Sequence, residues 1–191
     1  LRLSSRTPVL RTAKGHPMRY WLSLPPTWKP GGSWPVLVTA DGAGQNWEAS
    51  GRSFAAERDR RGLPFVVVSI VRLNPKDYGQ EEFEKHLRAA SPGDLFDLKG
   101  TRAVVDELGE EVGAEPRFYM TGFSAGGAPT WYLTIYHPEW LRASAPACGG
   151  FGLRAGASEP LVTEAPERET LPIRVFQGVD DRLALGPLAG D

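Results

Sequence analysis

The stretch RFYMTGFSAGGAPTWYLTIYH, residues 117–137, decides the fold because two kinds of secondary structure meet inside it. Residues 117–123 are rich in the aromatic and apolar side chains of a strand, and residues 124–137 have the composition of a helix. The pentapeptide GFSAG at 122–126 lies at the junction and fits the pattern G-x-S-x-G. A strand that turns at once into a helix at such a motif lifts Ser124 above the sheet edge, at a helix N-terminus.

A serine in this position suits nucleophilic catalysis. Glycines on both sides of it permit a tight turn, because a side chain there would meet the neighbouring strand and helix. The backbone N–H of the next residue, Ala125, is then expected to be one donor of an oxyanion hole. The alternative is a glycine-rich connection between strand and helix that carries no chemistry. The flanking pattern favours Ser124 as a nucleophile.

The rest of the chain predicts a layered α/β domain over residues 1–191, with a mostly parallel central sheet and helices on both faces. Several apolar runs are continuous and β-branched, which indicates strands buried on both faces of a sheet. Residues 96–112 carry apolar side chains at helical spacing, with charges on the other side. The predicted strands are 18–24, 36–40, 65–71, 117–123, 142–149 and 173–178.

Two long polar segments, 74–95 and 150–171, are rich in Gly, Pro and Glu. We expect them to be loops that shape the cleft, since specificity is commonly carried by loops. Trp47, in the loop after the strand at 36–40, and Tyr78, in the first polar segment, are candidate substrate-binding residues. Both aromatic side chains have a packing role as the alternative.

Two further parts of a serine hydrolase site are predicted from strand ends. The loop DGAG at 41–44 follows an early strand, so the N–H of Gly42 or Ala43 is the expected second oxyanion donor. The alternative is an ordinary glycine turn. Asp180 and Asp181 follow the last predicted strand. A carboxylate that follows the nucleophile in the chain is placed where the acid that orients a catalytic histidine is expected. The alternative is a solvated acid in a loop.

Composition excludes several other classes of function. A formal net charge of −1 gives no electrostatic reason to bind nucleic acid, and no apolar run reaches membrane-spanning length. Clustered ligands for a metal are absent from the sequence pattern, so neither metal nor organic cofactor is expected. The single cysteine, Cys148, forms no internal disulfide and is expected to be a small buried hydrophobe instead of a reactive thiol. We expect a soluble protein and leave secretion and oligomeric state open.

These residues resemble the α/β-hydrolase esterases, and among them the group of feruloyl esterases, polyhydroxyalkanoate depolymerases and predicted peptidases. The resemblance covers roughly residues 17–185 and is specific around Ser124. After the serine turn that group has a helix, a Pro-acid step and a small-residue strand, here PEW at 138–140 and PACGG at 146–150. The resemblance implies Ser124 as nucleophile and Ala125 as an oxyanion donor.

The resemblance also selects the acid. The group's late pattern H-G-x-x-D appears here as QGVDD at 177–181, which implies Asp181 in place of Asp180 as the triad acid. The group's H-G after the earlier strand appears as Asp41-Gly42. That histidine is not the catalytic one, so the change is expected to alter how the oxyanion loop is held.

The catalytic histidine of that group lies beyond the acid, and here the ten residues after Asp181 contain none. His137 is separated from Ser124 by thirteen residues of helix, about 20 Å, and cannot reach it. His16 precedes the first strands, and nothing in the motif selects His86, although its segment could overhang the cleft. Because a whole strand, helix and loop are absent together, we expect a C-terminally incomplete hydrolase domain, with a degenerate relative as the alternative.

The sequence thus predicts a serine hydrolase that cleaves carboxylic esters of small-molecule or polymer substrates through an acyl-enzyme on Ser124. One alternative is a non-catalytic binding module that keeps the cleft without turnover. The other is a peptidase or acyltransferase on the same scaffold, which fold alone does not separate from an esterase.

Overall fold

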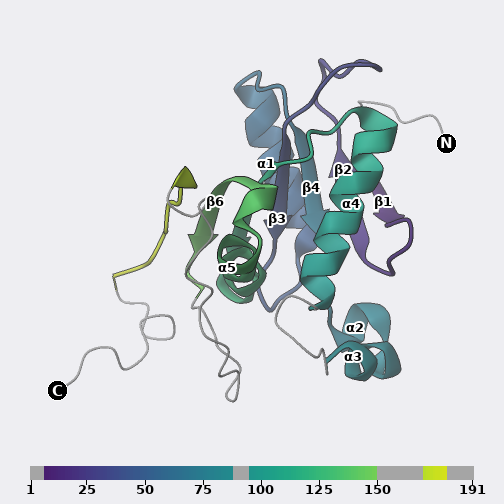
Figure 1. The fold of residues 1–191 in the computed structure, drawn as a ribbon, viewed down its shortest axis with the longest axis vertical. Helices are drawn as coiled ribbons and strands as arrows, with labels where there is room; N and C mark the ends of the chain where they lie inside the picture. The colour runs from purple at the N-terminus through teal and green to yellow at the C-terminus, as the bar shows by residue number, and fades with distance from the viewer. Residues whose placement is uncertain (1–6, 88–94, 150–169, 180–191) are drawn as a thin grey trace.

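The structure is a computed structural model that describes residues 7–87, 95–149 and 170–179. Six strands form one mixed sheet in the order β1-β2-β4-β3-β5-β6 (Figure 1). The four strands β4, β3, β5 and β6 run parallel, while β2 pairs antiparallel with both β4 and β1. The mostly parallel sheet is as predicted. The strands are β1 (Val9–Thr12), β2 (Arg19–Ser23), β3 (Val36–Ala40), β4 (Val66–Ile70), β5 (Phe118–Phe123) and β6 (Leu141–Ala147).

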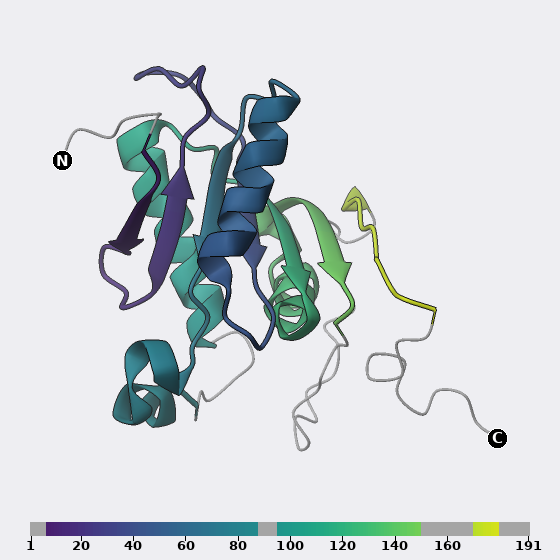
Figure 2. The ribbon, with the colours of Figure 1, turned by 180° about the vertical axis from the view of Figure 1, so that it is seen from behind.

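Helices cover both faces of this sheet, which confirms the predicted α/β architecture. Helix α1 lies against one face, and α4 and α5 lie against the other, as Figures 1 and 2 show from opposite sides. Two short helices, α2 and α3, lie beyond the carboxyl end of β4. The helices are α1 (Trp47–Arg60), α2 (Pro75–Tyr78), α3 (Gln80–Leu87), α4 (Phe96–Val112) and α5 (Gly127–Tyr136), with 3₁₀ turns η2 (Ser124–Gly126) and η3 (Pro138–Trp140).

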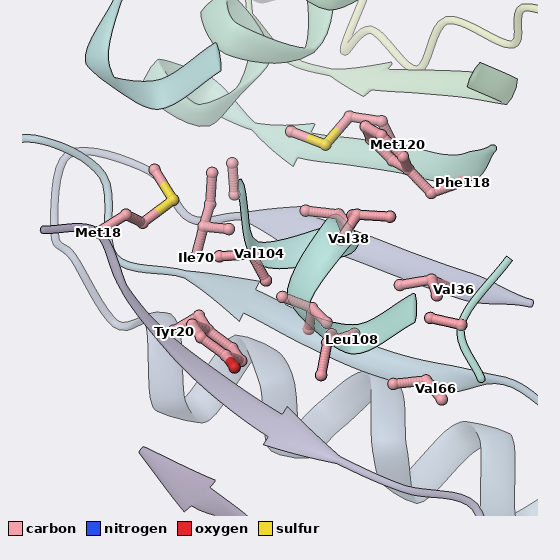
Figure 3. Packing of buried hydrophobic residues seen from close by; sticks show 14 of the residues in the cluster. Met18, Tyr20, Val36, Val38, Val66, Ile70, Val104, Leu108, Phe118 and Met120 are labelled. Atoms are coloured by element: carbon pink, nitrogen blue, oxygen red, sulfur yellow. The ribbon is translucent and has the colours of Figure 1, made fainter. Parts of the chain in front are cut away.

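The core lies mainly between the sheet and α4, and it follows the two-residue period of the strands. In β4, Val66, Val68 and Ile70 face α4, while Val67 faces α1. Figure 3 shows the larger cluster, with side chains from β2, β3, β4, β5 and α4 gathered together. Every residue of β4 is buried, as expected for a strand covered on both sides.

A buried carboxylate ties α4 to the first two strands. Glu107 of α4 accepts hydrogen bonds from Arg11 Nη2 (2.6 Å), the Lys14 N–H (2.7 Å) and the Tyr20 hydroxyl (3.0 Å). Burial of the Tyr20 ring raises the pKa of its phenol well above the usual value. The edge strand β1, which the sequence pattern did not predict, is therefore held by polar contacts, because its own side chains are only partly buried.

The sequence pattern did not predict helix α1, because the buried face of this helix lacks large apolar side chains. That face consists of Gly51, Ala55 and Arg58. A Cβ on Gly51 would stand 2.5 Å from the Trp21 ring, so glycine permits the close approach of α1 to β2. Arg58 donates to the carbonyl and hydroxyl oxygens of Ser23, which satisfies a guanidinium buried beneath the helix. Periodicity of large hydrophobics, the usual helix signal, is therefore missing.

Two other predicted boundaries were wrong in part. The described portion of the expected loop 74–95 is helical over α2 and α3, with the Asn74 side chain capping α2 through the Asp77 N–H (2.9 Å). The expected strand at 173–178 forms only two isolated parallel bridges with β6, at Ile173 and Phe176. The expected helix at 124–137 begins as the 3₁₀ turn η2 and continues as α5.

The face covered by α1 carries an apolar groove of about 430 Å³ beside that helix. Tyr119, which alternates with the core residues Phe118 and Met120 along β5, faces this groove, and Met120 also contributes to its lining. Its lining residues are Pro35, Leu37, Leu63, Pro64, Phe65, Tyr119, Met120, Thr121, Ala143, Ser144 and Ala145. Within the described ranges, no helix combines the length and the hydrophobicity needed to cross a bilayer.

Candidate active site

Ser124 stands at the junction between β5 and the helix that follows. Phe123 is still extended, with φ −104° and ψ 136°, and the 3₁₀ turn begins at Ser124 itself. Ser124 has a φ of +52°, in the left-handed region that non-glycine residues rarely occupy. Such a conformation costs on the order of 1–3 kcal/mol and persists where the surrounding structure enforces it. The predicted sharp turn is therefore present in the structure.

Backbone contacts require glycine at positions 122 and 126, on either side of Ser124. A Cβ on Gly122 would collide with the Gly126 carbonyl group and with Thr130 Oγ1. A Cβ on Gly126 would collide with the carbonyl oxygen of Ala40, at the end of β3. Because backbone atoms stand in the way, a small side-chain movement does not relieve either collision. The G-x-S-x-G spacing follows from how tightly β5, η2 and β3 pack.

The loop after β3 lies directly against Ser124. A Cβ built on Gly42 would stand 3.4 Å from the Cβ of Ser124 and 3.5 Å from the carbonyl oxygen of Phe123. This contact brings the predicted oxyanion loop and the predicted nucleophile together, although Gly42 and Ser124 are 82 positions apart in sequence. Gly42 is buried and Ala43, the other predicted donor in this loop, is exposed.

Internal hydrogen bonds close that loop at the start of α1. The Gln45 N–H donates to the Gly42 carbonyl oxygen (3.1 Å), and Gln45 has a φ of +53°. The Asn46 N–H donates to Asp41 Oδ2 (2.6 Å). Asp41, which stands where the resembling group has histidine, thus anchors the far end of the loop with its carboxylate.

Ala125, the other predicted oxyanion donor, is the second residue of η2 and is half-buried. N–H groups in the first turn of a helix have no partner four residues earlier. They also carry the partial positive charge of the helix N-terminus. The Ala125 N–H therefore belongs to a turn suited to receiving an anionic oxygen near Ser124.

The predicted acid, Asp181, and its neighbour Asp180 lie outside the described residues. The segment that leads toward them lies beside the end of β6, where the Cys148 N–H donates to the Phe176 carbonyl oxygen (2.7 Å). The next residue, Gly149, packs so closely that a Cβ there would collide with the carbonyl oxygen of Ser124. The chain from 173 to 176 therefore ends near the same edge of the sheet as the serine.

None of the three histidines has a described hydrogen bond to Ser124, and all three have other partners. His137 ends α5, with its ring stacked 3.8 Å from that of Trp140 and its Nδ1 3.2 Å from Glu139. The His16 ring lies 4.6 Å from that of Phe96, and its Nδ1 accepts from the Met18 N–H (3.1 Å). The expectation that His137 cannot reach Ser124 agrees with its place at the opposite end of α5.

His86 shares a small cavity with the start of α5. Its Nε2 lies 2.6 Å from Glu82, one turn earlier on α3, and its ring meets that of Phe96 edge-on at 4.9 Å. It lines a small cavity of about 130 Å³ together with Ala128 and Pro129 of α5.

Asp97 and Arg72 line the same cavity. Burial raises the pKa of the Asp97 carboxyl, although the Leu73 N–H donates to it (2.8 Å) and the charge of Arg72 opposes the rise. The cavity therefore combines a buried carboxyl, a guanidinium and a histidine beside the first turn of α5.

The two predicted substrate-binding aromatics have structural partners. The Tyr78 hydroxyl donates to the Val71 carbonyl oxygen (2.7 Å) and accepts from the Arg19 N–H (2.9 Å), and burial raises its pKa to about 12. Trp47 begins α1 and packs against the cluster of Trp21, Ala55 and Val67. These contacts favour the packing alternative for Tyr78, while Trp47 also borders an open hollow beside α2.

Two further features of the described part of the chain concern metal ligands and the single thiol. No group of three or more His, Cys, Asp or Glu side chains within it is arranged to hold a metal ion. Cys148 is half-buried, not fully buried as predicted, and has a φ of +49° directly after β6.

Comparison of the sequence with protein-family models and with curated proteins gives no match. Comparison of the structure with solved structures finds a thermostable esterase with a TM-score of 0.65 and 20% identity, over 93% of this chain. A poly(aspartic acid) hydrolase from Sphingomonas has a TM-score of 0.67 and 14% identity over 91%. A poly(3-hydroxybutyrate) depolymerase from Bordetella parapertussis has a TM-score of 0.62 and 18% identity over 86%.

Each match covers a larger share of this chain than of the solved structure to which it is aligned. The chain spans 48% of the esterase, 71% of the poly(aspartic acid) hydrolase and 60% of the depolymerase. At these identities the comparison concerns the fold. The mostly parallel sheet with helices on both faces agrees with it, and the chain has the α/β-hydrolase fold.

Proposed function

We propose that this chain carries the nucleophile of a serine hydrolase that cleaves carboxylic esters, with Ser124 as the attacking residue. The observation that carries the proposal is the placement of Ser124, with its φ of +52°, at the β5–η2 junction directly beside Gly42. Strain of this kind in a residue between two glycines is common at catalytic positions. An ordinary connection between strand and helix does not need a left-handed serine.

The proposed reaction follows from the groups around the serine. Ser124 Oγ attacks the ester carbonyl carbon, and the N–H of Ala125 together with that of Gly42 or Ala43 stabilises the tetrahedral oxyanion. Collapse of the intermediate expels the alcohol and leaves an acyl-enzyme on Ser124. Water then attacks this acyl group and releases the acid.

Proton transfer in this scheme needs a histidine held by an acid. Asp181 is the proposed acid, supported by the path of residues 173–176 beside β6. The three histidines of the sequence have the other partners described above, and the proposal names none of them as the base. Esters are the proposed substrates because a thermostable esterase and a polyester depolymerase share the fold.

A non-catalytic binding module is the second candidate, and one observation favours it. His86, which borders the cavity beside α5, is held by Glu82 and Phe96. If no other histidine completes the site, Ser124 stays unactivated. A peptidase or acyltransferase would use the same serine and would differ in its products and acceptors.

The test is labelling of the chain with a fluorophosphonate probe, read by intact mass, because such probes require an activated serine. Ser124→Ala is the variant, and Ser53→Ala, on the exposed side of α1, is the matched control. Stoichiometric labelling that Ser124→Ala abolishes and Ser53→Ala preserves supports the proposal. Labelling of a folded sample below a few per cent would mean that Ser124 is not activated in this chain, as in the binding module or in a hydrolase domain without its histidine. Release of acid from 4-nitrophenyl esters, compared with the matching anilides, separates an esterase from a peptidase.

A further inference from the structure

Arg72 lies level with the oxyanion loop because of the strand register. Strands β3 and β4 are parallel and pair Ala40 with Ile70. Gly42 and Arg72 lie two residues beyond the ends of these two strands. The Arg72 guanidinium spans the two consecutive carbonyl groups of the loop, since Nε donates to the Asp41 oxygen (2.9 Å) and Nη2 donates to the Gly42 oxygen (3.3 Å).

This contact determines which way two N–H groups of the loop face. A trans peptide unit points its carbonyl and its N–H in opposite directions, and no described peptide bond is cis. The Asp41 carbonyl shares its peptide unit with the Gly42 N–H, and the Gly42 carbonyl shares its unit with the Ala43 N–H. Because Arg72 draws both carbonyls toward itself, the N–H groups of Gly42 and Ala43 both face away from the guanidinium. Successive N–H groups that face one way form a concavity that attracts anions.

The loop needs such a constraint because of its glycine. Gly42 is free to adopt either sign of φ, so rotation of the peptide unit between Gly42 and Ala43 meets little steric resistance. The Gln45 N–H also bonds the Gly42 oxygen, but it belongs to the same loop and can move with it. Arg72 follows the buried strand β4 by two residues, and its hydrogen bonds therefore fix the loop relative to the sheet.

Arginine is the residue type that suits this task. Its planar fork presents donors from Nε and Nη at a fixed separation, whereas a lysine ammonium on a flexible stem acts as a point donor. The Arg72 side chain is also half-buried against the cavity that holds Asp97, so its position is restricted by packing.

We propose that Arg72 is a positioning residue of the hydrolase site: it orients the peptide units of Asp41–Gly42 and Gly42–Ala43 so that their N–H groups serve as oxyanion donors beside Ser124. The inference rests on the proposed function for its catalytic consequence. Arg72 orients the loop whether or not the chain is catalytic, and hydrogen exchange measures that effect without any catalysis.

The experiment compares Arg72→Ala and Arg72→Lys with Arg117→Lys in the full chain. Arg117 is a matched control, because it too donates from Nε (3.0 Å) and Nη2 to a backbone carbonyl, that of Leu141 at the start of β6, far from the serine turn. Hydrogen exchange by mass spectrometry over residues 41–46 reports the loop. The second-order rate constant for fluorophosphonate labelling of Ser124 reports the chemistry.

We expect both Arg72 variants to speed exchange in this loop at least tenfold while Arg117→Lys leaves it unchanged. We expect Arg72→Ala to slow labelling by roughly 10²-fold or more, the order of the loss of one oxyanion donor. Added guanidinium ion should restore part of the rate to Arg72→Ala and none to Arg117→Lys, which a loss of general stability would not produce.

Two results would overturn the inference. One is loop exchange in Arg72→Ala equal to that of the parent chain. The other is a labelling rate that falls no further in Arg72→Ala than in Arg117→Lys. A labelling rate of Arg72→Ala that added guanidinium does not raise would count equally against the inference. If the parent chain itself is not labelled, the proposed function fails for this chain, and loop exchange alone then decides whether Arg72 orients the loop.

Discussion

Replacement of Gly122 by alanine tests how tightly the serine turn is built. The added methyl group would overlap the carbonyl group of Gly126 and would stand 2.5 Å from Thr130 Oγ1. Overpacking of a buried site costs about 1–3 kcal/mol, and a collision with backbone belongs at the upper end of that range. We therefore expect Gly122→Ala to lower the free energy of unfolding by about 3 kcal/mol.

Urea unfolding followed by tryptophan fluorescence measures this loss. For a denaturant slope of about 2 kcal/mol/M, the urea midpoint should fall by about 1.5 M. Thermal unfolding should show a fall in Tm of roughly 6–12 °C, since about 1 kcal/mol corresponds to roughly 2–4 °C in a domain of this size. Labelling of Ser124 should fall as well, because the Gly126 carbonyl must move and the turn with it.

Gly109→Ala supplies the matched control, with the opposite sign. Gly109 lies exposed within α4, and a Cβ there would meet nothing closer than the Ala114 carbonyl oxygen at 3.6 Å. Glycine inside a helix is less stable than alanine by about 0.5–1 kcal/mol, so this variant should be more stable. If Gly122→Ala unfolds at the same midpoint as the parent chain, the packing argument for the G-x-S-x-G spacing is refuted.

Three further variants test the rest of the structure. Glu107→Ala should lower the free energy of unfolding by about 2–4 kcal/mol, because it leaves the Lys14 N–H and the Tyr20 hydroxyl without their acceptor and leaves Arg11 with Glu111 alone, and chemical denaturation at neutral pH measures the loss. Because the pKa of Asp97 is raised in the folded chain, the folded state binds the extra proton, and stability should fall as pH rises above the ordinary value of 3.8. Asp97→Asn should remove that fall, which denaturation at several pH values checks, and an unchanged slope would contradict it. Tyr78→Phe should lower stability by about 1–3 kcal/mol while leaving the KM for an ester unchanged, whereas a raised KM at unchanged stability would favour the substrate-binding alternative.

Hydrophobic pattern predicted the centre of the sheet well. The runs at 36–40 and 65–71 became β3 and β4 nearly residue for residue, since a strand buried on both faces needs continuous apolar side chains. Helix α4 matches its predicted range of 96–112, because its apolar stripe packs on the core. These elements carry their own burial pattern and needed no tertiary information.

Elements held by polar or small residues left no such pattern. Helix α1 buries glycine, alanine and a hydrogen-bonded arginine, and β1 is an edge strand joined to α4 through Glu107. Helices α2 and α3 depend on a side-chain cap and on the hydroxyl of Tyr78, which stands between two strands of the sheet. Contacts of this kind connect residues far apart in sequence, so local patterns did not predict them.

By itself the sequence determined the parallel core of the sheet and the position of the serine turn, because both depend on local periodicity and on glycines at fixed spacing. The tertiary structure brought the predicted loop 41–44 against Ser124, because β3 and β5 are neighbours in the sheet although Gly42 and Ser124 are 82 positions apart. It also decided that Arg72 holds that loop, since the register of β3 on β4 brings the two strand ends level. Strand order and register arise from packing of the whole chain, and no short stretch of sequence contains them.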